Sequence, residues 1–194
     1  MKKFFAVMLV ALFGAVPLFA DDVADVKATI VKNLELTAKG DFAGTLALFM
    51  PDFQQTGSDG DTTNYEQLKW GLLALDGKHP KECLLIIVTQ QLKGAKIPEA
   101  MMENIDKMAR DPEFVKNYET NIPAVVAMLK ADADLELKTL KFISVDVNGD
   151  KAVVITEYDS KDPESGEIKH EIETGSMRKV DGKWMFYRSV VKDK

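Results

Sequence analysis

Two Asx-Gly dipeptides near the C-terminus constrain the fold of this chain most strongly. Asn148-Gly149 and Asp181-Gly182 each separate two segments whose apolar and polar residues alternate. Such dipeptides between alternating segments are the strongest short-range signal of a tight β-hairpin. Residues 140–194 are therefore predicted to form four antiparallel strands, joined by these two turns and by an exposed polar loop at residues 160–166.

Alternation also predicts which side chains share a face of these strands. On the last strand Trp184, Phe186, Arg188 and Val190 are expected on one face. On the strand before it, the residues expected on one face are Ile168, His170, Ile172, Thr174 and Ser176.

Helical periodicity precedes the strands. Apolar residues recur at spacings of three and four over residues 22–39, which predicts an amphipathic helix ended by Gly40. Asp41 is the expected N-cap of a second, short helix that stops at Pro51. Residues 52–57 follow as a short extended segment.

A helical region occupies the middle of the chain. Thr63 and Glu66 have the spacing of a capping box, which predicts a third helix from about this point. The apolar run at residues 83–88 is favoured as part of a further helix because polar residues extend it to helical length. Short helices are also predicted to start near Pro98, Pro112 and Pro123, because proline is favoured at the first position of a helix. From Leu135 the apolar residues recur with the period of a strand.

The first twenty residues have the pattern of a secretory signal. Lys2 and Lys3 precede an almost wholly apolar segment, and a small residue, Ala20, stands before the first acidic residue. A retained membrane anchor is the alternative, but the apolar run is broken by a glycine and a proline and is shorter than the roughly 20 residues of a spanning helix. We therefore expect residues 1–20 to be cleaved, and the mature protein to be periplasmic or secreted without a membrane span.

Composition excludes several classes of partner and site. The net charge is −6, and loss of Lys2 and Lys3 changes it to −8, which argues against nucleic acid as a partner. Cys83 is the single cysteine and the two histidines are far apart, so no metal-ligand spacing of the usual kind occurs. No disulfide is possible within the mature chain, and no cofactor motif is found.

Acid–base candidates are few. A general acid or base needs a titratable side chain held near the reacting group. His170 either points into the sheet's covered side or sits solvated at a strand end, and Asp52 either lines a pocket or stabilises the turn after Pro51. The complete set of candidates is Asp52, Tyr158, His170, Glu171 and Glu173.

Ligand-binding candidates are mostly aromatic. Trp70 and Trp184 either stack on an apolar ligand or belong to the core. Tyr65 suits a pocket mouth because one end of a tyrosine is apolar and the other polar. The predicted ligand-binding residues are Tyr65, Trp70, Thr174 and Trp184.

Helices first and an antiparallel meander last define an α+β fold. In that order the chain resembles the nuclear transport factor 2-like (NTF2-like) superfamily, also called SnoaL-like or ketosteroid-isomerase-like. The resemblance rests on Gly40-Asp41-Phe42 with residues 46–53, the Asp59-Gly60 loop with residues 65–69, and the two Asx-Gly hairpins. It covers residues 22–77 and 135–191, so residues 21–194 are expected to form one domain with a helical insertion at about residues 79–134.

The resemblance implies a cone-shaped half-barrel, in which helices cover a curved antiparallel sheet whose concave face can form a pocket. In the ketosteroid isomerases a catalytic aspartate ends the short segment after the second helix. The matching place here is about Gly57, which has no side chain to take a proton. The resemblance therefore implies the scaffold without its best-known catalytic residue.

Three functions are compatible with these observations. The leading hypothesis is an exported, non-enzymatic protein that holds a small apolar ligand or a protein partner in the concave pocket or the helical insertion. The second is a small isomerase or dehydratase, which requires at least two of Asp52, Tyr158 and His170 to converge in one pocket. The third is a homodimeric interaction module that pairs through the open sheet face, which sedimentation at micromolar concentration would test.

Overall fold

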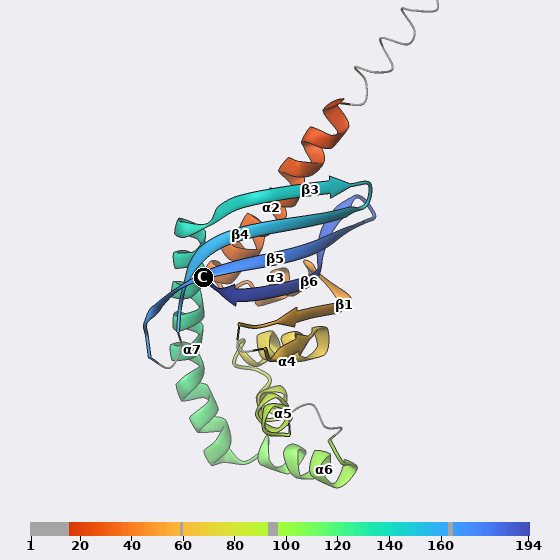
Figure 1. Ribbon diagram of the computed structural model, residues 1–194. Helices are drawn as coiled ribbons and strands as arrows, with labels where there is room; N and C mark the ends of the chain where they lie inside the picture. Colours follow the sequence, from red (N-terminus) through yellow and green to blue (C-terminus); the bar gives the residue numbers. More distant parts are fainter. Residues whose placement is uncertain (1–15, 59, 93–96, 163–164) are drawn as a thin grey trace, which may run out of the picture.

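The computed structural model describes residues 16–194 except residues 59, 93–96 and 163–164 (Figure 1). The predicted signal therefore lies almost entirely outside the described residues. In the described part of the chain, two helices and two strands come first, four helices follow, and a run of four strands comes last. The elements are α2 (Val16–Lys39), α3 (Phe42–Leu46), β1 (Phe49–Thr56), β2 (Thr62–Asn64), α4 (Tyr65–Ala74), α5 (Pro80–Gln91), α6 (Glu99–Met108), α7 (Pro112–Thr139), β3 (Lys141–Asn148), β4 (Lys151–Lys161), β5 (Ile168–Val180) and β6 (Lys183–Asp193).

The predicted four-stranded meander is confirmed. Strands β3 to β6 pair antiparallel in sequence order. Both predicted turns need left-handed backbone, and Gly149, Asp181 and Gly182 have φ values of +62°, +49° and +77°. One pair departs from the expected antiparallel sheet, because β1 lies parallel to β6 and β2 then pairs with β1 at the edge.

The N-terminal helices form largely as the sequence predicts. Helix α2 ends before Gly40, whose φ is +80°, and the Asp41 side chain accepts a hydrogen bond of 2.9 Å from the Gly44 amide at the start of α3. The prediction that this second helix continues to Pro51 is wrong, because the chain enters β1 at Phe49. Pro51 is tolerated there because the pairing of β1 with β6 is irregular between Phe49 and Gln54.

The third helix begins close to the predicted place, but its capping box lies one residue further along the chain. Asn64, not Thr63, is its N-cap, and Gln67, not Glu66, completes the capping box. The Asn64 amide donates to Gln67 Oε1 over 2.9 Å, and the Gln67 amide donates to Asn64 Oδ1 over 3.0 Å. Asn64 and Gln67 make the same two side-chain to backbone hydrogen bonds that were expected of Thr63 and Glu66.

The helical insertion contains α5, α6 and most of α7. Helix α5 confirms the predicted helical reading of residues 83–88, and Asp111 caps α7 directly before Pro112. The expected helix start at Pro123 is wrong, because Pro123 lies inside α7, which continues past Leu135 to Thr139. An interior proline costs a helix roughly 3 kcal/mol of stability, which packing on both sides of Pro123 offsets. On its N-terminal side, Tyr118 is buried and donates a hydrogen bond to the Ala74 carbonyl. On its C-terminal side, Ala133 is 3 % exposed.

Two apolar cores result from this arrangement. The first lies between the concave face of the sheet and α2, and its buried residues are Val26, Phe53, Ala152, Val154, Met177, Trp184 and Phe186. The second lies in the insertion, and its buried residues are Leu84, Leu85, Ile105 and Ala109. The expected cone with helices over one side of a curved sheet is therefore confirmed (Figure 1).

A bulge in β6 changes the predicted faces of that strand. Met177 of β5 pairs with Phe186 and Ser176 pairs with Arg188, so Tyr187 is an extra residue. Trp184 and Phe186 face the core as predicted. Beyond the bulge the alternation reverses, so Ser189 and Val191 are buried. Arg188 and Val190, which were predicted to share the face of Trp184 and Phe186, are exposed.

Candidate functional site

The interior of the cone is filled by its own side chains. The cavity there has a volume of only about 20 Å³ and is bordered by Ile30, Thr156, Glu173, Met177 and Phe186. Ligand pockets for small molecules are generally several hundred Å³. The cone interior therefore has room for about one water molecule and not for an organic ligand.

Polar side chains gather on the concave face beside this small cavity. Glu173 accepts hydrogen bonds at both carboxylate oxygens, from the Ser189 hydroxyl and, over 3.3 Å, from the Tyr158 hydroxyl. Tyr158 and Ser189 are buried, and Glu173 is partly buried. Helix α7 contributes a further partly buried carboxyl, Glu136, to the same region.

Burial dominates the electrostatics of this group. Removal from water, together with the charges of Asp132, Glu173 and Glu171, raises the pKa of Glu136 to about 8. Burial likewise raises the pKa of Glu173, against the opposing effect of its two hydrogen-bond donors. The pKa of Tyr158 is also raised, first by burial and then by the Glu173 charge, so Tyr158 stays a neutral donor.

Glu136→Gln is expected to stabilise the protein at pH 8.5. The pKa of the folded Glu136 carboxyl, about 8, lies above its ordinary value of 4.5. The folded state therefore binds this proton more tightly, and the stability that it contributes is lost as the pH rises from 4.5 through 8. Because Glu136 is partly exposed, we expect a gain of roughly 1–3 kcal/mol in unfolding free energy, below the full linkage value.

Urea unfolding at pH 5 and pH 8.5 measures this effect. The control is Glu103→Gln, at an exposed glutamate of α6, which should leave the pH dependence of stability unchanged. An E136Q protein whose stability declines between the two pH values as steeply as that of the wild type would contradict the assignment of the buried proton to Glu136.

Glu171 pairs with Tyr158 across the strands, whereas His170 and Asp52 lie away from it. His170 pairs across the strands with Asp159, and its imidazole is 66 % exposed and bonded to the Asp159 carboxylate on the outer face of the sheet. Asp52 is also on the outer side, 3.7 Å from the Arg178 guanidinium. The structure brings Tyr158 together with Glu173, and it does not bring Asp52 or His170 to that point.

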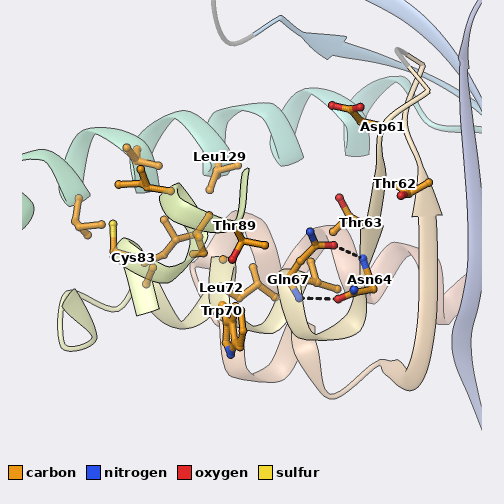
Figure 2. Close-up of a pocket in the computed structure, with 18 residues that line it drawn as sticks. Asp61, Thr62, Thr63, Asn64, Gln67, Trp70, Leu72, Cys83, Thr89 and Leu129 are labelled. Atoms are coloured by element: carbon orange, nitrogen blue, oxygen red, sulfur yellow. Dashed lines mark hydrogen bonds between the residues drawn. The ribbon is translucent and has the colours of Figure 1, made fainter. Parts of the chain in front are cut away.

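A much larger cavity lies in the helical region (Figure 2). We call it the helical groove, and its walls come from β2, α4, α5 and α7. Its volume is about 960 Å³. Ile87 and Val125 on its walls are 42 % and 37 % exposed, so apolar surface there is open to solvent. Other apolar side chains along it are Trp70, Leu72, Leu75, Ile86, Ile122 and Leu129.

The helical groove has a polar end and an apolar end. Figure 2 shows Asp61, Thr63, Asn64 and Gln67 together at one end, with Cys83 at the other. In the capping box the side-chain oxygens of Asn64 and Gln67 each accept one backbone hydrogen bond, and each of these side chains also carries an NH2 donor. At the far end, burial raises the pKa of the Cys83 thiol, which keeps the thiol neutral.

The predicted ligand-binding residues fall in three different places. Trp70 lines the helical groove. Tyr65 packs against the first core, and Trp184, which is 3 % exposed, belongs to it. Thr174 is exposed on the outer face of β5. The sequence did not indicate Glu136, Ser189 or the groove walls from α5 and α7, because these depend on the bulge and on how the insertion packs.

The outer face of the sheet carries no helix among the described elements (Figure 1). Val153, Ile168 and Val190 on that face are 46 %, 52 % and 38 % exposed. An antiparallel sheet commonly has one face in water, so these exposures are compatible with a monomer. The homodimer through this face stays a prediction.

No helix in the described part of the chain is long and apolar enough to cross a membrane. No group of three or more His, Cys, Asp or Glu residues among those placed by the structure is arranged to hold a metal ion.

Comparison with known proteins gives a fold and no activity. No family model matches the sequence, and no curated protein does. Among solved structures, an NTF2-like protein with a cystatin-like fold from Novosphingobium aromaticivorans is 12 % identical with a TM-score of 0.50, covering 93 % of this chain and 87 % of that one. An NTF2-like protein of unknown function from Silicibacter pomeroyi is 14 % identical with a TM-score of 0.47, covering 91 % and 98 %. At such identities a likeness shows the fold alone, and the chain therefore has the NTF2-like fold that its sequence resembles.

Proposed function

We propose that this is an exported binding protein that holds a small apolar ligand in the helical groove and not in the cone. The observation that carries the proposal is the groove's volume of about 960 Å³ and its apolar lining. A cavity of this size with few convergent polar groups is the usual form of a small-molecule site. The pattern of residues 1–20 supports export of the protein.

The contrast between the two cavities favours binding over catalysis. The carboxyl and tyrosine groups with raised pKa values lie beside a cavity of only about 20 Å³. The helical groove is large enough to hold a substrate. Its described lining residues include one acidic side chain, Asp61, and no basic one. The Tyr158–Glu173 pair is thus separated from the space that could hold a substrate.

Tryptophan fluorescence offers a direct test. Trp70 lines the helical groove, and Trp184, the other tryptophan of the chain, lies in the first core. The apolar probe 1-N-phenylnaphthylamine is expected to bind saturably and to quench Trp70 by energy transfer. Because Trp70 lines the groove, the fraction of emission that the probe quenches should be larger in Trp184→Phe than in Trp70→Phe.

Cys83 supplies an independent readout of the same site. It is the single cysteine and lines the apolar end of the groove. Saturating phenylnaphthylamine should therefore slow its reaction with a maleimide severalfold. Binding that leaves the Cys83 rate unchanged, with quenching in Trp70→Phe as strong as in Trp184→Phe, would place the probe elsewhere and overturn the proposal.

A further inference from the structure

Helix α7 connects the helical groove to the polar group inside the cone. It runs from α6 at one end to the start of β3 at the other (Figure 1), and its middle turns line the groove with Ile122, Val125 and Leu129. We infer that pH regulates the groove, because α7 seats fully against the sheet only while Glu136 carries its proton. This inference rests on the proposed function, since it concerns the regulation of the same groove.

The groove and the cone meet the same face of α7. Leu129, Ala133 and Glu136 follow one another at spacings of four and three, which places them along one side of a helix. Leu129 lines the groove, Ala133 is buried, and Glu136 lies among the polar residues of the cone. About two turns of one helix therefore separate the ligand space from the carboxyl group.

Hydrogen bonds attach α7 to both parts of the molecule. At the cone, the side chains of Asp132 and Thr139 accept hydrogen bonds of 2.7 Å and 2.9 Å from backbone amides of β4. At the groove, the Tyr118 hydroxyl donates to the carbonyl of Ala74, which is itself a lining residue. Packed helices shift as rigid elements, so a displacement of α7 at the sheet also moves the groove wall.

The groups whose charges act on Glu136 are all acidic, so no cation offsets its ionised form. The titratable side chains that face it are Asp132 of α7, Tyr158 of β4, and Glu171 and Glu173 of β5. Helix α2 also packs against α7, but its Lys32 is exposed and its Glu35 and Lys39 pair with each other over 3.5 Å. A carboxylate formed at Glu136 is therefore relieved only if α7 moves and admits water.

The sign of the pH effect follows from this environment. In the seated form the pKa of Glu136 is about 8, above its ordinary value of 4.5, to which access of water would return it. The advantage of the seated form therefore declines as the pH rises from 4.5 and is fully lost above about 8. A ligand that requires the seated wall then binds more weakly, and by reciprocity its binding near pH 8 takes up a proton.

The affinity for phenylnaphthylamine, measured by probe emission from pH 6 to pH 9, tests the inference. In the wild type and in the exposed-site control Glu103→Gln, the affinity is expected to fall at least about threefold by pH 9. In Glu136→Gln it should change by less than about 1.5-fold, because glutamine has no proton to lose. Burial keeps the pKa of the Cys83 thiol raised, and this thiol is common to all three proteins. An equal pH dependence in wild type and Glu136→Gln would overturn the inference.

The ligand-free protein gives a second readout, which separates this inference from the proposed function. In Trp184→Phe the remaining tryptophan, Trp70, lines the groove, so its emission should change as the pH passes through about 8. Adding Glu136→Gln should remove this change, while circular dichroism shows that both proteins stay folded. If the probe does not bind at pH 6, the proposed function fails, and Trp70 emission alone decides whether α7 responds to Glu136. If the probe binds but neither readout depends on Glu136, the pH regulation fails and the groove survives.

Discussion

Replacing Met177 with alanine is expected to lower the free energy of unfolding by about 2–5 kcal/mol, the usual cost of truncating a fully buried methionine. Met177 is 1 % exposed and lies in the first core with Val26, Phe53 and Trp184. It also borders the existing 20 Å³ cavity, so the space left by the lost atoms joins a gap already present. The cost depends on residual cavity volume, which favours the upper part of this range.

The matched control is the same substitution at Met108. Met108 ends α6 and is 52 % exposed, so Met108→Ala removes the same atoms from a site that buries little. Its effect should stay within about 0.5 kcal/mol. Denaturant unfolding followed by tryptophan emission measures both variants. Similar effects for the two would show that the cone is not the main source of stability.

The meander was predictable because its information is local. Each Asx-Gly turn fixes its own hairpin, and Asp181 and Gly182 have the positive φ that such a turn demands. The order of the strands then follows from the chain. The cap at Asp41 was equally readable, because its hydrogen bond to the Gly44 amide spans three residues.

Features that depend on distant partners were not predictable. The bulge at Tyr187 arises where β6 pairs with β5, and it turns Ser189 inward against the simple alternation. Pro123 looked like a helix start because proline favours that position. Its place inside α7 rests on packing that involves Tyr118 and the Ala74 carbonyl, 44 residues away in sequence.

The difference between local features and features that depend on distant partners also explains which site residues could be predicted from the sequence. Tyr158 and Glu173 were candidates by residue type, and the structure adds that they bond to each other. Glu136 joins them only because α7 crosses to β4. The helical groove needs β2, α4, α5 and α7 in their folded arrangement, and Trp70 was the one predicted residue to line it.

Replacing Gly71 with phenylalanine is expected to weaken ligand binding strongly without unfolding the protein. Gly71 lies within α4 and lines the helical groove. A Cβ atom added there meets no other atom within 4 Å, and the backbone is not in the left-handed region that would strain a side chain. The new ring would extend into space that the ligand needs, so the affinity for phenylnaphthylamine should fall at least about tenfold, equivalent to about 1.4 kcal/mol.

Gly71→Ala is the control that separates filling of the groove from a change in the helix. A single methyl group leaves most of the 960 Å³ open, so binding should remain within about twofold of wild type. Both substitutions replace a glycine inside α4, and alanine should stabilise the helix by about 0.5–1 kcal/mol. Lost binding in Gly71→Phe therefore cannot come from a weaker helix. Probe emission and Cys83 protection measure the outcome while the chain keeps its two tryptophans, and full binding by Gly71→Phe would show that the ligand lies outside the groove.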